Sequence, residues 1–461
     1  MQEIKLNDIK TVYFIGIGGI GMSALARYFL LRGAAVHGYD KTETELTKLL
    51  AKEGMKVHYE DDVTYIPKEV DLVIYTPAVP KHHSELVYFQ ENGFSVLKRS
   101  EVLGIISRGM KCIGVAGTHG KTTTSSIVTH VLRTGGVDVT AFLGGISHAL
   151  GSNFVEGKSD WVVVEADEFD RSFLRLSPDM AIVTAIDPDH LDIYGDEANF
   201  IKGFVDYSDR LKDGGKMFKQ TQLVDFQQNS DSILRGVEWA TYGVDGGDYR
   251  SENLRVEDGF FVFDYKSAIE NIDNIKFSLP GRHNVENATA AIAVAQHLGV
   301  KSGAIKEALL HFQGIKRRFE FKVRPQNTEG PVYIDDYAHH PTELESAIAA
   351  ARALYPTRRL TGIFQPHLYT RTRDFQDGFA SALDKLDEVF LMDIYPAREL
   401  PIEGVTSEML FKKMKNNHKT LVTKANLMEI LRGSSFDVVM TLGAGDIDTF
   451  VQPIKEMLEF K

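Results

Sequence analysis

The chain has 461 residues, of which 43% are hydrophobic and 25% charged, and its formal net charge is −12. These values are typical of a globular protein of about three domains, and the acidic balance excludes nucleic acid as the main partner because no surplus of cations can neutralise phosphates. We expect a protein of the reducing cytoplasm with no membrane partner: no apolar run reaches about 18 residues, no signal peptide is evident, and Cys112, the single cysteine, is expected to be a buried hydrophobe.

The N-terminal part of the chain alternates between strand and helix patterns. Apolar runs at residues 11–16, 34–40 and 71–76 predict strands, and residues 23–32 and 44–53 predict helices. Such alternation indicates a mostly parallel, doubly wound α/β sheet.

A glycine-rich turn follows the first predicted strand. It comprises residues 16–21 and matches the G-x-G-x-x-G fingerprint of dinucleotide-binding folds, and Asp40 ends the second strand where such folds place a ribose-binding acid. Three interpretations are open: an NAD-dependent dehydrogenase, a tight turn that only packs a strand against a helix, or a cradle for the pyrophosphate of another nucleotide.

A second glycine-rich turn comprises residues 117–124. It follows a predicted strand at residues 112–116 and precedes a predicted helix at 125–132. Its backbone N–H groups and the helix N-terminus suit a phosphate, Lys121 can reach the β- and γ-phosphates, and the Thr122 hydroxyl can ligate Mg²⁺. The spacing departs from the common P-loop, which has glycine where this chain has Val115. A simple dehydrogenase needs no second phosphate loop, so this turn favours the third interpretation of residues 16–21.

Two further buried strands, at residues 161–165 and 180–184, end next to polar groups. Glu165 lies where a parallel strand presents a carboxylate to Mg²⁺, although a surface acidic turn is the plainer alternative. His190 follows the next strand, and spacing alone leaves a structural histidine equally open. Residues 214–280 are more polar, and we expect irregular structure with scattered short strands there, such as residues 259–263.

The second predicted domain closes with a predicted helix at residues 284–297. Asn284 and Asn287 share one face of it, and from spacing alone either could simply cap the helix. The cationic run around Arg318 is either a solvated face or a phosphate contact made when domains close.

The third predicted domain again alternates strands with helices. The strands are expected at residues 332–335, 360–364, 388–392 and 437–441. Polar runs follow the first two of these strands, at residues 335–343 and 365–373. Open α/β sheets place ligands at the rim formed by such strand ends, so we expect these groups to meet.

Taken in order, these stretches resemble the Mur ligases. The resemblance rests on Phe14–Ser23, Gly117–Thr122, Glu165–Glu168, Asp189–Asp192, Arg282–Asn287, Lys316–Phe319, Asp336–Pro341 and Phe364–His367. It implies a three-domain α/β protein: a Rossmann-like UDP-sugar domain at 1–103, a P-loop-type ATP domain at 104–322, and a Rossmann-like domain at 323–461 that binds the amino acid and closes over ATP. The first and eighth stretches look most like the branch of the family that joins L-alanine to UDP-N-acetylmuramate.

The resemblance also implies roles for individual residues. Catalytic roles fall to Lys121, His190, Arg318 and His339. ATP would be bound by Gly117, Thr118, His119, Gly120, Lys121, Thr122, Thr123, Asn284, Asn287, Arg318 and Asp336. The UDP-sugar would be bound by Gly16, Gly18, Gly19, Gly21 and Asp40, the amino acid by Tyr337, His339, His367 and Arg371, and Mg²⁺ or Mn²⁺ by Thr122, Glu165 and His190.

The implied reaction activates the lactyl carboxylate of UDP-N-acetylmuramate with ATP and then forms an amide with L-alanine, in a monomer or homodimer that serves cell-wall synthesis. Two departures bear on it: Phe169 replaces a common serine, and Leu368 replaces a basic residue, which leaves Arg371 to meet the alanine carboxylate. The alternatives are a sister ligase that attaches a tripeptide, an NAD-dependent oxidoreductase, and a regulatory nucleotide-binding protein.

Overall fold

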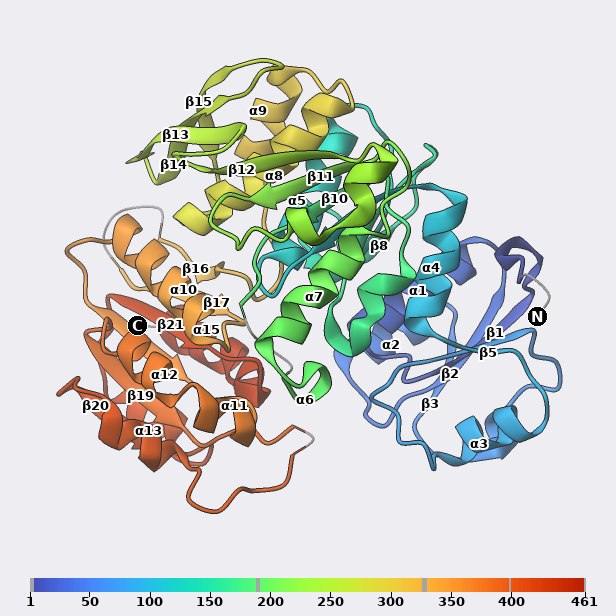
Figure 1. Ribbon diagram of the computed structural model, residues 1–461. Coiled ribbons are helices and arrows are strands. Elements are labelled where there is room, and N and C mark those ends of the chain that lie inside the picture. The colour runs from blue at the N-terminus through green and yellow to red at the C-terminus, as the bar shows by residue number, and fades with distance from the viewer. Residues whose placement is uncertain (1–3, 188–190, 326–329, 398, 460–461) are drawn as a thin grey trace. The chain divides into compact units, whose positions relative to one another are not determined.

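The computed structural model describes residues 4–187, 191–325, 330–397 and 399–459 (Figure 1). Contacts along the chain group it into two compact units. Unit 1 comprises residues 1–252, 265–273 and 286–309, and unit 2 comprises residues 253–264, 274–285 and 310–461. Among the described residues, no helix is long and apolar enough to cross a membrane.

The first sheet of unit 1 has the strand order β3-β2-β1-β4-β5 and is parallel throughout (blue in Figure 1). This order puts a topological switch point beside β1, where open sheets bind ligands. The predicted doubly wound sheet is therefore confirmed. Its elements are β1 (Thr11–Ile15), α1 (Ile20–Leu31), β2 (Ala35–Tyr39), α2 (Glu45–Lys52), β3 (Lys56–His58), β4 (Leu72–Tyr75), α3 (Ser84–Glu91), β5 (Val96–Lys98) and α4 (Arg99–Gly109).

The second sheet has the order β15-β14-β13-β12-β11-β10-β6-β9-β7-β8. Its central strands β10, β6 and β9 are parallel and almost wholly buried, as expected for a sheet covered on both faces. The elements from residue 111 to residue 208 are β6 (Lys111–Ala116), α5 (Lys121–Thr134), β7 (Thr140–Ser147), β8 (Ser152–Val155), β9 (Trp161–Ala166), β10 (Met180–Val183), α6 (Leu191–Tyr194) and α7 (Glu197–Ser208).

Residues 214–280 are more regular than predicted. They supply strands β11 to β15, and only the segment at β14 had been expected as a strand by its apolar run. β13 is half exposed and β15 alternates buried with exposed positions, so neither shows a continuous apolar run. The elements are β11 (Lys216–Gln220), β12 (Glu238–Val244), β13 (Tyr249–Glu257), β14 (Phe260–Lys266), β15 (Ile272–Phe277), α8 (Arg282–His297) and α9 (Ser302–Leu310).

Unit 2 contains a third sheet of order β16-β17-β21-β18-β19-β20 (orange to red in Figure 1). Apart from the antiparallel edge strand β16, its pairs are parallel, so the predicted alternation is confirmed here too. The strands are β16 (Glu320–Val323), β17 (Val332–Asp336), β18 (Leu360–Phe364), β19 (Glu388–Met392), β20 (Lys419–Val422) and β21 (Val438–Leu442). The helices are α10 (Pro341–Leu354), α11 (Tyr369–Asp374), α12 (Gln376–Leu383), α13 (Ser407–Lys413), α14 (Leu427–Arg432) and α15 (Val451–Glu459).

Three helices begin earlier than predicted, of which α8 begins at Arg282 rather than residue 284. α1 begins at Ile20 rather than residue 23, so Gly21 belongs to its first turn rather than to the loop. α5 begins at Lys121 rather than residue 125. Cys112 is fully buried and unpaired in β6, where burial raises the pKa of its thiol to about 12, so the expected role as a buried hydrophobe is confirmed.

Candidate active site

The glycine turn after β1 is closed by the end of β2. Gly16 and Ile17 both donate their backbone N–H to the Tyr39 carbonyl, at 2.8 and 3.0 Å, and the Gly18 N–H donates to Asp40 Oδ2 at 2.7 Å. A Cβ at Gly18 would lie 2.8 Å from that carboxylate oxygen, so only glycine allows this approach. The structure thus brings Asp40 to the turn and shows its carboxylate fixing the turn's backbone, while its contact with a ribose stays a prediction.

A pocket of about 260 Å³ opens beside this turn, within unit 1. Its walls come from both sheets: Gly19, Ile20, Gly21, Met22, Ala24, Thr76, Arg99 and Leu103 from the N-terminal part, and Phe142, Leu143, Gly144, Glu165 and Asp167 from the second sheet. Arg99 crosses the pocket wall and pairs with Asp167 at 3.2 Å. A ligand held by the glycine turn therefore has Glu165 within the same pocket.

Asn153 in β8 ties the first turn of α1 to the second sheet. Its amide donates to the Ile20 carbonyl at 2.5 Å and to Ser23 Oγ at 2.9 Å, and its oxygen accepts from Arg27. Arg27 also makes two 2.8 Å bonds to Glu53. Because Asn153 is fully buried, these contacts fix the first turn of α1 against β8 of the second sheet.

The second glycine turn joins β6 to α5, as predicted. Gly117 and Gly120 have φ of +132° and +81°, which glycine adopts without strain, and a Cβ at Gly117 would lie 2.2 Å from Thr184 Oγ1. Asn287 lies beside the turn, because its Oδ1 is 2.9 Å from where a Cβ of Gly120 would stand. Since α5 begins at Lys121, the turn presents a helix N-terminus, which favours an anion.

The remaining residues of this turn are anchored from the segment after β10. The Thr118 hydroxyl accepts from the Asp187 N–H at 3.1 Å, and His119 Nε2 lies 3.3 Å from Asp187 Oδ2. Thr123 is buried within α5. Thr118 and His119, two of the predicted ATP residues, thus have partners that hold the turn's shape.

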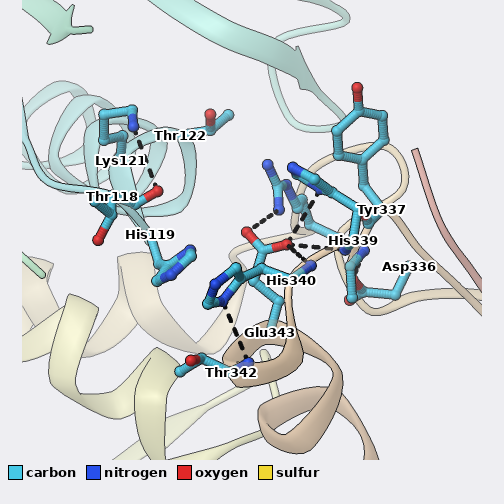
Figure 2. Close-up of polar contacts among 12 residues, drawn as sticks. Thr118, His119, Lys121, Thr122, Asp336, Tyr337, His339, His340, Thr342 and Glu343 are labelled. Atoms are coloured by element: carbon cyan, nitrogen blue, oxygen red, sulfur yellow. Dashed lines mark hydrogen bonds and ion pairs between the residues drawn. The ribbon is translucent and has the colours of Figure 1, made fainter. Parts of the chain in front are cut away.

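Lys121 is held by a buried carboxylate. Its Nζ donates to the Gly117 carbonyl at 2.6 Å and to both oxygens of Glu168, at 2.9 and 2.7 Å (Figure 2 shows Lys121 and Thr118 in this turn). Burial acts to lower the pKa of Lys121, but the charges of Glu168, Asp167 and Glu165 outweigh it, and the pKa is raised. Lys121 is therefore a permanent cation, as a phosphate contact requires.

Glu168 was not singled out by sequence reasoning. The run Glu165–Glu168 had been noted, but which of its acids would turn toward Lys121 depends on how β9 ends. Arg99, Thr76 and Asn153 were also missed, and no sequence pattern marks them.

The residues predicted to hold a metal fit Mg²⁺ as far as they are described. Thr122 Oγ1 donates to both oxygens of Glu165, at 3.1 and 2.9 Å, and the Gly144 N–H donates to Oε2 at 2.9 Å. A Cβ at Gly144 would fill the cradle of this carboxylate, at 2.2 Å from Oε2. Hydroxyl and carboxylate oxygens are ligands that Mg²⁺ prefers. His190 lies outside the described residues, and in the described part of the chain no cluster of three or more His, Cys, Asp or Glu could hold a metal.

In unit 2, Asp336 at the end of β17 organises a tight turn at residues 317–319. Its Oδ2 accepts from the Phe319 N–H and its Oδ1 from the Ala338 N–H, both at 2.7 Å. Arg317 and Phe319 have φ of +59° and +48°, so Arg318 stands between two residues in the left-handed region. Burial raises the pKa of Asp336 to about 6, although Arg318 and the two N–H donors oppose it.

The predicted amino-acid residues do meet at this rim of the sheet. The His339 ring lies 5.2 Å from Tyr337 and 5.9 Å from His367, and Arg371 Nη1 lies 3.4 Å from His367 Nδ1. Arg318 stands over the Tyr337 ring at 5.2 Å. The polar runs after β17 and β18 therefore converge, as the strand-end argument expected.

Two residues behave differently from a simple ligand contact. Asn284 donates its side-chain N–H to the Pro280 carbonyl at 2.5 Å and is buried, so this bond ties its amide to the segment just before α8. Leu368, the residue that departs from the family pattern, has φ of +71° and is buried, with its N–H bonded to the Tyr395 carbonyl at 2.9 Å. The turn before α11 is thus held in an uncommon conformation without the basic side chain.

Comparison with known proteins gives matches over nearly the whole chain. Three family models match in order: "Mur ligase family, catalytic domain" at residues 11–111, "Mur ligase middle domain" at 115–295, and "Mur ligase, glutamate ligase domain" at 317–445.

Curated relatives named UDP-N-acetylmuramate–L-alanine ligase match over nearly their full length. The one from Christiangramia forsetii is 48% identical and covers 98% of both chains, and the one from Flavobacterium psychrophilum is 50% identical and covers 99% of this chain and 100% of its own. The crystal structure of UDP-N-acetylmuramate-alanine ligase from Thermotoga maritima superimposes with a TM-score of 0.83 at 29% identity, covering 98% of this chain and 100% of the other. A murein peptide ligase from Psychrobacter arcticus shares the fold, with a TM-score of 0.70 at 21% identity and coverage of 97% and 98%.

These matches, together with the two glycine turns and the residues that surround them, establish that the chain belongs to the Mur ligase family.

Proposed function

We propose that this protein joins L-alanine to UDP-N-acetylmuramate at the expense of ATP, in cytoplasmic peptidoglycan synthesis. The carboxylate of the sugar's lactyl group attacks the γ-phosphate of ATP, which gives an acyl phosphate and ADP. The amine of alanine then attacks the acyl carbon, and phosphate leaves. The relatives that match at 48–50% identity carry the name of this activity.

The observation that carries the proposal is the pocket that joins the first glycine turn to Glu165. A UDP-sugar whose pyrophosphate lies on that turn extends its sugar toward Glu165, and Glu165 is bonded to Thr122 in the first turn of α5. The second glycine turn, which suits the phosphates of ATP, lies immediately before the helix turn that contains Thr122. Both substrates that must react would thus meet at one carboxylate. An NAD-dependent oxidoreductase would use the first turn alone and leave Lys121, Thr122 and Glu165 without a role.

The phosphoryl transfer needs charge neutralisation and alignment more than covalent chemistry. Lys121, a permanent cation at the helix N-terminus, would contact the β- and γ-phosphates, and Arg318 would contact the transferred group. Thr122 and Glu165 would hold Mg²⁺ or Mn²⁺, joined by His190 in the family's pattern. When bound, the metal supplies positive charge to the phosphate oxygens.

The amino-acid step belongs to the cluster on unit 2. Arg371 would pair with the carboxylate of alanine, while Tyr337, His339 and His367 line the place where its amine stands. Acyl phosphates hydrolyse readily, so the site must exclude water while the amine attacks.

A substrate-panel assay tests the proposal. Phosphate release is measured with ATP, Mg²⁺ and UDP-N-acetylmuramate, and with L-alanine, other single amino acids or a tripeptide as the acceptor. We expect turnover with L-alanine that requires all four components. Turnover with the tripeptide alone would instead assign the chain to the sister ligases.

A further inference from the structure

Glu343 stands at the third position of α10 and caps the helix. Its Oε2 accepts from the backbone N–H of His339 at 2.9 Å and of His340 at 3.3 Å, and the His340 ring accepts from the Thr342 N–H at 3.4 Å (Figure 2). This is a capping box, in which a side chain and a backbone satisfy each other's free groups. Capping alone would explain an acid here.

The same carboxylate also contacts two side chains assigned to the reaction. Oε2 lies 3.2 Å from His339 Nδ1, and Oε1 lies 3.8 Å from the Arg318 guanidinium. With its side chain only 14% exposed, Glu343 exerts its charge on both through little water. One acid therefore links the helix start, the histidine and the arginine.

The contacts of His339 fix which of its nitrogens carries the proton. Nδ1 faces two acceptors, the Tyr337 carbonyl at 3.0 Å and Glu343 Oε2 at 3.2 Å. A nitrogen between two acceptors must be the N–H, so the neutral ring presents an unprotonated Nε2. An acid that holds Nδ1–H in this way also stabilises the imidazolium that forms when Nε2 takes a proton.

Among the groups around His339, Glu343 raises the pKa of its ring the most. Burial lowers the pKa of His339, and the cations Arg371 and Arg318 lower it further, whereas Glu343 and the Tyr337 carbonyl raise it. The neighbouring His367 ring lies 5.9 Å away on the segment after β18. The net effect lowers the pKa, which keeps His339 neutral and able to accept a proton near pH 7.

We propose that Glu343 is a positioning residue that holds His339 with Nε2 as the proton acceptor for the incoming amine. This rests on the proposed function. The ammonium of alanine gives one proton to Nε2, and its freed lone pair forms the C–N bond with the acyl carbon. The C–O bond to phosphate then breaks, and the departing phosphate takes the second proton from nitrogen. Glu343 stays ionised throughout and faces the resulting imidazolium.

The test uses Glu343→Gln, which keeps an oxygen that can accept the helix's N–H bonds but removes the charge. Glu101→Gln is the matched control, because Glu101 caps α4 in the same position, accepts from the Lys98 N–H at 2.8 Å and lies 3.8 Å from Arg175. Each variant removes the charge of one helix-capping glutamate that lies near an arginine. A loss caused by weakened capping should therefore appear in both.

The first readout is the NMR titration of ¹⁵N-histidine-labelled full chain without substrates, with the His339 signals assigned by His339→Gln. We expect Nδ1–H in the wild type and a lower pKa of His339 in Glu343→Gln, with no change in Glu101→Gln. An unchanged His339 pKa in Glu343→Gln, or a proton on Nε2 in the wild type, overturns the proposal.

The second readout is the pH dependence of kcat at saturating substrates. Because His339 must be neutral to act, activity rises with pH through its pKa, and a lower pKa moves this limb to lower pH. We expect Glu343→Gln to show that movement together with a plateau reduced about tenfold or more, since general bases contribute about 10²- to 10⁴-fold. A reduced plateau with an unmoved limb would make Glu343 merely structural. A wild type without alanine-dependent turnover would remove the proposed function, whereas the titration would still report whether Glu343 controls His339.

Discussion

Replacement of Lys121 by methionine should separate its two roles, as partner of a buried acid and as ligand of phosphate. In the structure Lys121 Nζ lies 2.7 Å from Glu168, whose side chain is 3% exposed. Methionine has nearly the same length and no charge, so Lys121→Met leaves Glu168 buried without its cation. Glu168→Gln and the double variant complete a double-mutant cycle.

The expected size follows from the burial of the pair. Breaking a buried ion pair by removing one partner costs about 3–5 kcal/mol, whereas replacing both partners is close to neutral. For a domain of this size about 1 kcal/mol shifts the thermal midpoint by roughly 2–4 °C, so Lys121→Met should lower it by roughly 6 °C or more. The loss should grow as pH rises, because an unpaired Glu168 must bind a proton or remain as a buried charge. The double variant should return close to the wild-type midpoint.

Activity, unlike stability, should not return in the double variant. Loss of a charge that contacts the transferred phosphoryl group costs about 10²-fold or more, and adding Glu168→Gln does not replace that charge. Thermal unfolding and phosphate release, measured on all four proteins, decide the matter. Recovery of activity in the double variant would show that Lys121 serves only to neutralise Glu168, and a Lys121→Met protein as stable as the wild type would refute the buried-pair reasoning.

Three further changes test the pocket and the sheet beside it. Gly144→Ala puts a methyl 2.2 Å from Glu165 Oε2 and should raise the Mg²⁺ concentration needed for half-maximal activity, whereas Gly303→Ala, with nothing within 4 Å, should not. Asn153→Ala removes buried hydrogen bonds worth about 1–3 kcal/mol and should weaken UDP-sugar binding, measured by calorimetry, more than ATP binding; equal weakening would contradict its role at the first glycine turn. Burial raises the pKa of Glu85 to about 7, so the folded state binds its proton more tightly than the unfolded state and stability falls as pH rises from about 4.5 to about 7. Glu85→Gln should abolish that fall in urea unfolding, and a pH dependence equal to the wild type would contradict the assignment.

The sequence predicted those features that depend on local pattern. Glycine turns between an apolar strand and a helix are recognisable because few other residues allow the backbone to approach so closely, as at Gly18 and Gly117. The meeting of Tyr337, His339 and His367 followed from the rule that parallel strands end at one edge.

Features that depend on distant packing were missed. α5 begins at Lys121, although three successive threonines disfavour a helix; their burial against the second sheet overrides that preference. Asn153 bonds to residues more than a hundred positions away, and no local pattern encodes such a contact. Glu343 lay inside a noted polar run, but its contact with Arg318 depends on the turn that Asp336 holds.

Transfer of oxygen from the sugar to phosphate tests the central claim most directly. UDP-N-acetylmuramate labelled with ¹⁸O in its lactyl carboxylate is incubated with ATP, Mg²⁺ and L-alanine, and the phosphate and the sugar product are analysed by mass spectrometry. Attack of the carboxylate on ATP predicts one ¹⁸O in the released phosphate for each molecule of alanine joined to the sugar. Unlabelled phosphate, or labelled phosphate without an alanine amide, would contradict the proposed reaction.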